Sequence, residues 1–256
     1  MIETMSRKRA IASLISLVIT TSACGGLTGS GAATSTVAAT SAPAATVTPA
    51  ARSAQLSELQ NTVQSRESPS AEWQAAAEGQ QVAAGGGVKT GEAARAKVSL
   101  SDGTIIRLAP ATEFELTELS PQPTDPVTQL KLTAGKMWVI VTKALGGGAF
   151  DIETPSGVAT VRGSLMSTEF YPADGRMIVT CLDGQCRLQS ATSGKFVDLS
   201  GGQQSGIPAY GRDPGAIITI NVNQVSDWAR EVPEAASLVA TITPGPPPTE
   251  TPAPAP

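Results

Sequence analysis

The sequence predicts an all-β protein with one short C-terminal helix and disordered ends. Between residues 87 and 203, short segments alternate apolar and polar residues and are separated by turns that contain glycine. Alternation with a period of two is typical of strands with one buried face. Many short strands joined by glycine turns favour an all-β fold, although periodicity alone leaves a sandwich and a barrel open.

Residues 1–23 are predicted to be a signal peptide. A positive stretch at residues 7–9 precedes an apolar stretch at residues 10–19 and small residues up to Ala23, which is the order of a secretory signal. This ten-residue stretch makes a helix of only ~15 Å, half of the ~30 Å hydrocarbon core of a bilayer. We therefore expect export rather than a permanent membrane span. Glu3 is unusual in such a segment, which leaves Met5 as an alternative start.

Cys24 follows this segment and resembles the lipid-modified cysteine of bacterial lipoproteins. Small residues flank it on both sides, although Thr21 stands where the lipoprotein pattern favours leucine. The alternative is an ordinary signal peptide with an incidental cysteine. We expect lipidation at Cys24, and with it an exported protein anchored to the cell membrane on its extracytoplasmic side.

Two low-complexity segments frame the predicted folded part. Residues 24–52 are mostly Ala, Thr, Ser and Gly and read as a flexible tether, because such a composition cannot bury enough apolar surface to fold. Residues 241–256 contain seven prolines and predict an extended tail. Between them we place a β-domain at residues 53–207, followed by a strand and a helix at 208–240 that pack on it.

The clearest strand pair lies around the turn at residues 101–103. Ala96, Val98 and Leu100 alternate with polar residues, and Ile106 and Leu108 do so after the turn. A three-residue loop with glycine in the left-handed region pairs Val98 with Ile106 and Ala96 with Leu108, which keeps one face apolar. Further strands are expected at residues 130–140, 150–152, 158–161 and 168–171.

Cys181 and Cys186 are predicted to form a disulfide. With Cys24 assigned to lipid, they are the remaining two of three cysteines, and an even pair in an exported protein favours a bridge. Asp183-Gly184 between alternating arms predicts a two-residue β-hairpin in which the two cysteines face each other. The alternative is two buried free thiols. A metal site is far less favoured, because too few further ligands are available.

The expected helix begins after Asn223, its predicted cap, and ends before Pro233. Val225, Trp228 and Val232 fall at helical spacing within it, as does Ala229. We interpret Trp228 as a core residue that covers the sheet rather than a residue that stacks on a ligand.

A set of motifs ordered along the chain resembles the FecR-like domain of bacterial envelope regulators. The central run is IETPSGVATVRGS at residues 152–164, and the others are Thr90-Gly91, the alternating segment 96–110, Leu130-x-Leu132-x-x-Gly135 and Gly202-Gln203. The resemblance implies a compact twisted sandwich with a solenoid-like stack. It also implies an envelope location, since the family is named after a membrane-spanning iron-uptake regulator.

The same resemblance draws attention to Arg162, Gly163 and Ser164. Related regulators tend to have Gly-Thr here, and some cleave themselves at that bond when the hydroxyl attacks the preceding carbonyl. Serine can perform the same acyl shift, but only with a strained backbone and a proton acceptor, and the chain contains no histidine. Our interpretation is a tight turn between two core strands with Arg162 solvated. Self-cleavage or ligand binding at this turn is the alternative.

Composition argues against several functional classes. The formal net charge of −4 provides no basic surface for nucleic acid. The missing histidines remove the usual general base and the commonest metal ligand, so we expect no enzyme activity, cofactor or metal. The glycine-rich run at residues 85–91 has Val88 where a phosphate loop needs glycine. Glu113 and Glu115 are interpreted as surface acids of a strand rather than a glycosidase pair.

These observations predict a membrane-anchored, extracytoplasmic, non-catalytic module that binds a ligand or senses a signal. Expected partners are the membrane, through the lipid, and an envelope protein, a peptide or a glycan. Only nine residues precede the apolar stretch, so we expect no direct contact with a sigma factor. The alternative is a structural scaffold of the envelope or surface layer that has no soluble ligand.

Overall fold

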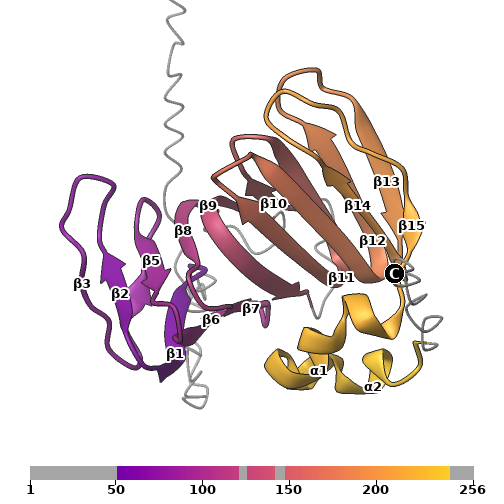
Figure 1. Cartoon of the computed structure of the whole chain (residues 1–256). Coiled ribbons are helices and arrows are strands. Elements are labelled where there is room, and N and C mark those ends of the chain that lie inside the picture. The colour runs from indigo at the N-terminus through magenta and orange to yellow at the C-terminus, as the bar shows by residue number, and fades with distance from the viewer. Residues whose placement is uncertain (1–50, 121–125, 142–147, 243–256) are drawn as a thin grey trace, which may run out of the picture. The chain divides into compact units, whose positions relative to one another are not determined.

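The computed structural model describes residues 51–120, 126–141 and 148–242 (Figure 1). The chain divides into two compact units, residues 1–46 and 47–256, and all described residues belong to the second. The predicted signal peptide, Cys24, most of the predicted tether and most of the proline-rich tail therefore lie outside the described residues. Within the described part, no helix is long and apolar enough to cross a membrane.

Fifteen strands form one hydrogen-bonded sheet in the described residues. The strands before the first gap are β1 (Ala54–Gln60), β2 (Val63–Arg66), β3 (Gln74–Ala75), β4 (Gln81–Val82), β5 (Gly87–Thr90), β6 (Arg95–Leu100), β7 (Ile105–Leu108) and β8 (Glu113–Leu119). The later strands are β9 (Val127–Ile140), β10 (Ala149–Glu153), β11 (Gly157–Tyr171), β12 (Arg176–Ser190), β13 (Phe196–Ser200), β14 (Gln203–Ile207) and β15 (Ile218–Thr219).

The sheet is mixed, and its main path runs β15-β14-β12-β11-β10-β9-β7-β6-β1-β4. β9 and β10 pair in parallel, whereas neighbours such as β11 and β12 are antiparallel. One face of the strands, the inner face, carries a continuous apolar core to which β1, β6, β8, β9, β11, β12 and β13 all contribute. The all-β prediction is confirmed, and a single curved sheet encloses that core.

The predicted pairing around residues 101–103 is confirmed. Val98 lies opposite Ile106 and Ala96 opposite Leu108. Gly103 has a φ of 93°, the left-handed conformation that the three-residue loop requires. All four paired side chains are buried, so the turn sets the register that keeps one face of the pair apolar.

Three long strands share an irregularity that the sequence pattern does not make obvious. Successive inner-face residues are separated by five positions in each: Leu132 and Met137 in β9, Val161 and Met166 in β11, Cys181 and Cys186 in β12. An odd separation would place such residues on opposite faces of a regular strand. A glycine with positive φ lies in every interval, Gly135 at 87°, Gly163 at 62° and Gly184 at 77°. The β-bulge at each glycine inserts one extra residue, so that the apolar side chains on both sides of it point to the inner face.

The predicted hairpin at Asp183-Gly184 is wrong. Residues 176–190 form the continuous strand β12, which pairs along its length with β11. At the bulge β12 changes its other neighbour, from β14 beside Cys181 to β13 beside Cys186. Gly184 has the left-handed conformation expected of a turn, but it lies in a β-bulge. Pairing with β11 on one side and with β13 and β14 on the other keeps the strand extended.

A second apolar cluster lies on the outer face, opposite the main core, at one end of β7, β9, β11 and β12. There the C-terminal elements η1 (Val222–Gln224), α1 (Ser226–Glu231), η2 (Pro233–Ala235) and α2 (Ala236–Val239) cover the sheet (Figure 1). Trp228 is fully buried against this end, together with Trp138 of β9. The predicted helix and the core role of Trp228 are confirmed.

The cap of this helical segment differs from the prediction. Asn221, rather than Asn223, is the capping residue: its side chain accepts a hydrogen bond from the Asn223 backbone N–H at the start of η1. The Gln224 side chain accepts a hydrogen bond from the Asn221 backbone N–H in return, which completes a capping box. The chain also continues into η2 and α2 beyond Pro233, because proline is tolerated in the first turn of a new helical segment.

Candidate functional site

A groove of about 390 Å³ lies on the outer face of β11, β12 and β13, on the other side of the bulges from the helical segment. This volume falls in the range of about 300–1,000 Å³ that is usual for ligand sites. Two other pockets in the described residues are smaller, about 170 and 160 Å³. The residues that line the groove are Thr160, Arg162, Gln185, Cys186, Arg187, Gln189 and Asp198.

Strand register explains why these side chains meet. Thr160 of β11 lies opposite Arg187 of β12, and Arg187 lies opposite Asp198 of β13. Because residues opposite each other in a ladder point to the same face, the three form one row across the outer surface. Arg162 and Gln185 belong to the next row. The inner residues between these rows, such as Val161 and Leu199, are fully buried.

Arg187 and Asp198 form the best-defined interaction of the groove. The Arg187 guanidinium donates two hydrogen bonds to the Asp198 carboxylate, Nε to Oδ1 at 2.7 Å and Nη2 to Oδ2 at 3.1 Å. The hydrogen bond from Arg187 lowers the pKa of Asp198, and the same bond raises the pKa of Arg187. The guanidinium also stacks 4.0 Å from the ring centroid of Phe196, which is half exposed. This pair is therefore fixed in orientation.

Arg162 has a different environment. Its charge contributes to the lowered pKa of Asp198, yet within the described residues no ion pair or side-chain hydrogen bond joins it. The residue is exposed, and the bulge between Arg162 and Leu165 shifts the register of β11 at this point. Bulges often redirect a side chain beside a functional site. The Arg162 guanidinium is thus available to a ligand.

The predicted tight turn at Arg162, Gly163 and Ser164 is wrong in its local geometry. All three residues lie inside the continuous strand β11, where Gly163 is exposed and has a φ of 62°. Pairing with β12 on both sides of the bulge keeps the strand extended. The side chain of Ser164 is not among the described atoms.

The structure joins Cys181 and Cys186 in a disulfide, with Cα atoms 5.9 Å apart. Both cysteines are buried on the inner face, and Cys186 also contributes to the wall of the groove. Their partners in β11 are Met166 and Val161, the residues that flank the bulge beside Arg162. The bridge therefore spans the β12 bulge directly opposite the β11 bulge.

Sequence reasoning singled out Arg162 and the two cysteines separately and did not place them together. It missed Thr160, Gln185, Arg187, Gln189 and Asp198, which line the same groove. A signal was present, because these residues occupy the polar positions of alternating strands. The predicted hairpin hid this signal. With a turn at Gly184, residues 176–190 would not form the single strand that pairs with β11 along its length.

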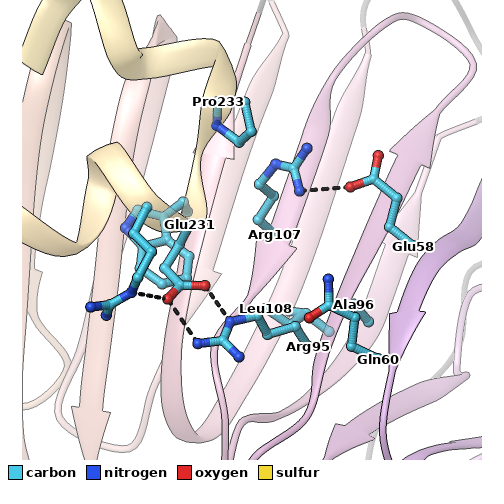
Figure 2. Close-up of a pocket in the computed structure, with 10 residues that line it drawn as sticks. Glu58, Gln60, Arg95, Ala96, Arg107, Leu108, Glu231 and Pro233 are labelled. Carbon is cyan, nitrogen blue, oxygen red and sulfur yellow. Dashed lines mark hydrogen bonds and ion pairs between the residues drawn. The ribbon is translucent and has the colours of Figure 1, made fainter.

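The second pocket lies where the helical segment meets the sheet, and ion pairs fill it (Figure 2). Arg95 of β6 donates to Glu231 of α1, Nη2 to Oε1 at 2.9 Å. Arg107 of β7 pairs with Glu58 at 2.9 Å and with Glu234 of η2 at 2.9 Å. Each of these carboxylates already has a cationic partner. The ion pairs therefore hold the helical segment on the sheet and do not serve to bind a ligand.

The remaining acidic candidates have structural partners. Glu113 pairs with Lys89 at 3.3 Å and Glu115 with Arg66 at 3.4 Å. Among the described residues, no group of three or more cysteine, aspartate or glutamate side chains is arranged to hold a metal ion.

Comparison with known proteins gives a partial family match. The profile of the family described as FecR protein matches residues 87–187, which include the bulges of β9, β11 and β12 and all groove residues except Gln189 and Asp198. No curated protein gives a significant match.

Two crystal structures from Parabacteroides distasonis, each described as a "putative anti-sigma factor", match part of this chain. They were determined at 2.50 and 1.65 Å resolution and match with TM-scores of 0.47 and 0.46. Both are 17% identical in sequence to this chain, over 56% of it and 63% of their own length. The match therefore spans less than two thirds of those structures.

Proposed function

We propose that this FecR-domain protein is an exported, lipid-anchored module that binds an envelope ligand without catalysis and takes part in signalling. The groove on β11, β12 and β13 is the binding face in this proposal. The observation that carries it is the exposed Arg162, which lines the groove of about 390 Å³ beside a bulge that faces a disulfide-bridged bulge.

Three features support binding rather than chemistry. The chain has no histidine, which is the usual general base near neutral pH. The Thr160 hydroxyl is the only hydroxyl group among the described groove residues, and it donates to Asp151 at 2.6 Å. The Arg187 guanidinium and the Asp198 carboxylate satisfy each other. A nucleophile with an adjacent base, which covalent catalysis needs, is not assembled among these residues.

The proposed anchor and compartment rest on the sequence. The signal-like residues 1–23 and Cys24 predict a lipoprotein on the extracytoplasmic side of the membrane. A disulfide between Cys181 and Cys186 is consistent with such an oxidising location. Signalling partners would then contact the described β-domain, which the tether holds near the membrane surface.

Photo-crosslinking in living cells tests this function. A diazirine amino acid replaces Gln189, at the rim of the groove, and in a matched strain it replaces Gln74, which is exposed on β3. We expect an envelope-associated adduct from position 189 and none from position 74. Adducts at position 74 alone, or none at either position, would refute the proposed binding face and favour a scaffold without a soluble ligand.

A further inference from the structure

The charge of the groove identifies one feature of its ligand. Its lining contains two arginines and one aspartate, a formal charge of +1, on a chain whose formal net charge is −4. Asp198 neutralises Arg187, so the charge that remains belongs to Arg162. A guanidinium is planar and presents a fork of donors that matches a carboxylate. The complementary group on the ligand is therefore an anion with paired oxygens, of which a carboxylate is the simplest.

The other polar groups of the groove suit a ligand that carries hydroxyls. Gln185 and Gln189 each use one amide N–H within the protein, donating to Ser200 Oγ at 3.4 Å and to the Gly194 carbonyl at 2.9 Å. The amide oxygen and the second N–H of each remain to accept and donate hydrogen bonds in the groove. The Asp198 carboxylate accepts, as do the lone pairs of the Thr160 hydroxyl, whose proton is directed to Asp151. Hydroxyl groups also donate and accept, so a row of hydroxyls can satisfy this mixed lining.

A protein partner fits the groove less well. Protein interfaces take most of their binding energy from aromatic and apolar side chains buried in well-packed pockets. Among the described lining residues, Cys186 is the only one without a hydrogen-bonding side chain of the amide, hydroxyl, carboxylate or guanidinium type, and it is disulfide-bonded. The half-exposed Phe196 ring, next to Gln189 in the ladder, offers an apolar surface to the C–H groups of a sugar ring.

We infer that the groove binds a saccharide that carries carboxylate groups, with Arg162 contacting the carboxylate. This inference rests on the proposed function and adds the class of ligand. Arg187 and Asp198, fixed against Phe196, form the floor that the hydroxyls contact. The two opposed bulges hold Arg162 at the edge of that floor.

Calorimetric titration of the full chain tests the inference with three probes. These are an oligogalacturonate, the same oligosaccharide with every carboxylate methyl-esterified, and an oligoglutamate of similar charge. We expect binding of the oligogalacturonate alone. Arg162→Gln should weaken it about tenfold, the size of one lost charge-assisted hydrogen bond. Arg176→Gln, a matched change at an exposed arginine outside the groove, should leave binding unchanged.

Each other result overturns a stated part. Equal binding of the esterified probe would show that the carboxylate is not recognised, and equal binding of oligoglutamate would show that the sugar is not. No binding of the oligogalacturonate, or equal weakening by both arginine variants, would also overturn the inference. If the crosslink from position 189 is made to a polypeptide, the binding face stands and the saccharide is refuted, so the two proposals fail separately.

Discussion

Cys181 and Cys186 lie on the same face of one unbroken strand, with their Cα atoms 5.9 Å apart across the bulge at Gly184. Opposite them in β11 are Met166 and Val161, on either side of the bulge next to Arg162. The disulfide therefore restrains the two bulges, where the alternation of inner-face and outer-face side chains shifts by one residue in both β11 and β12. Because Arg162 extends from this site, its position depends on the same pair of bulges.

Removing the disulfide should lower stability without preventing folding. The loop that it closes is very short, so chain entropy gives a loss of about 2 kcal/mol in the free energy of unfolding for the Cys181→Ala, Cys186→Ala double variant. Urea denaturation measures this, and a reductant should destabilise the wild type by a similar amount but leave the double variant unchanged. Ready alkylation of both thiols in native, unreduced protein would show that the bridge does not form.

Glycines with positive φ should differ in their tolerance of alanine. Gly135 and Gly202 have φ of 87° and 84°, so alanine is strained at both. At Gly135 an added Cβ would also lie 2.6 Å from the backbone of Ala111 and Thr112, whereas at Gly202 nothing lies within 4 Å. We expect a loss of about 1 kcal/mol for Gly202→Ala and about 3 kcal/mol for Gly135→Ala in urea denaturation. Equal losses would mean that β9 does not approach Thr112 so closely.

Acid should loosen the attachment of the helical segment. The hydrogen bond from Arg95 holds the pKa of Glu231 below its ordinary 4.5. A lowered folded pKa contributes stability that is present above the unfolded value and is lost as the pH falls through the folded value. Amide exchange of residues 226–239, corrected for the intrinsic rate, should therefore accelerate as the pH falls below 4.5 and through the lowered pKa of Glu231.

The Glu231→Gln variant tests whether the Arg95–Glu231 ion pair causes this acid dependence. It should exchange faster at neutral pH and lose part of the acid dependence, whereas Glu67→Gln, at an exposed acid outside this contact, should behave as the wild type. If protection of residues 226–239 stays constant across the acid range in the wild type, the ion pairs do not secure this segment.

Lipidation is tested on the mature N-terminus. Mass spectrometry of the membrane fraction should find a chain that begins at Cys24 and carries lipid, because the residues before it have the order of a signal peptide. Cys24→Ala should release the protein or leave it unprocessed. A soluble wild-type protein with an unmodified N-terminus at another residue would assign processing to a general signal peptidase instead.

Local patterns predicted much of the β-domain. Alternation around residues 101–103 gave the correct pairs, since a three-residue loop leaves only one register that buries Val98 and Ile106 together. The spacing of Trp228 and Val232 predicted a helix that covers the sheet, and both residues are fully buried. In these segments the local signal and the tertiary contacts favour the same structure.

The prediction failed where one local signal serves two structures. Asp183-Gly184 supports a left-handed glycine in either a hairpin or a bulge, and only the pairing of β12 with β11, β13 and β14 decides between them. For the same reason the sequence predicted a turn at Arg162-Gly163, where the structure has a bulge inside β11. The groove could not be assembled from the sequence, because Thr160, Arg187 and Asp198 meet only through the register of three strands.

The central claim is that the groove beside Arg162 is the binding face, and the yield of the crosslink from position 189 in living cells tests it most directly. The yield is compared in three backgrounds: the native residues, Arg162→Gln and Arg176→Gln. We predict a yield that falls about tenfold with Arg162→Gln and is unchanged with Arg176→Gln. The same yield in all three backgrounds would contradict the claim.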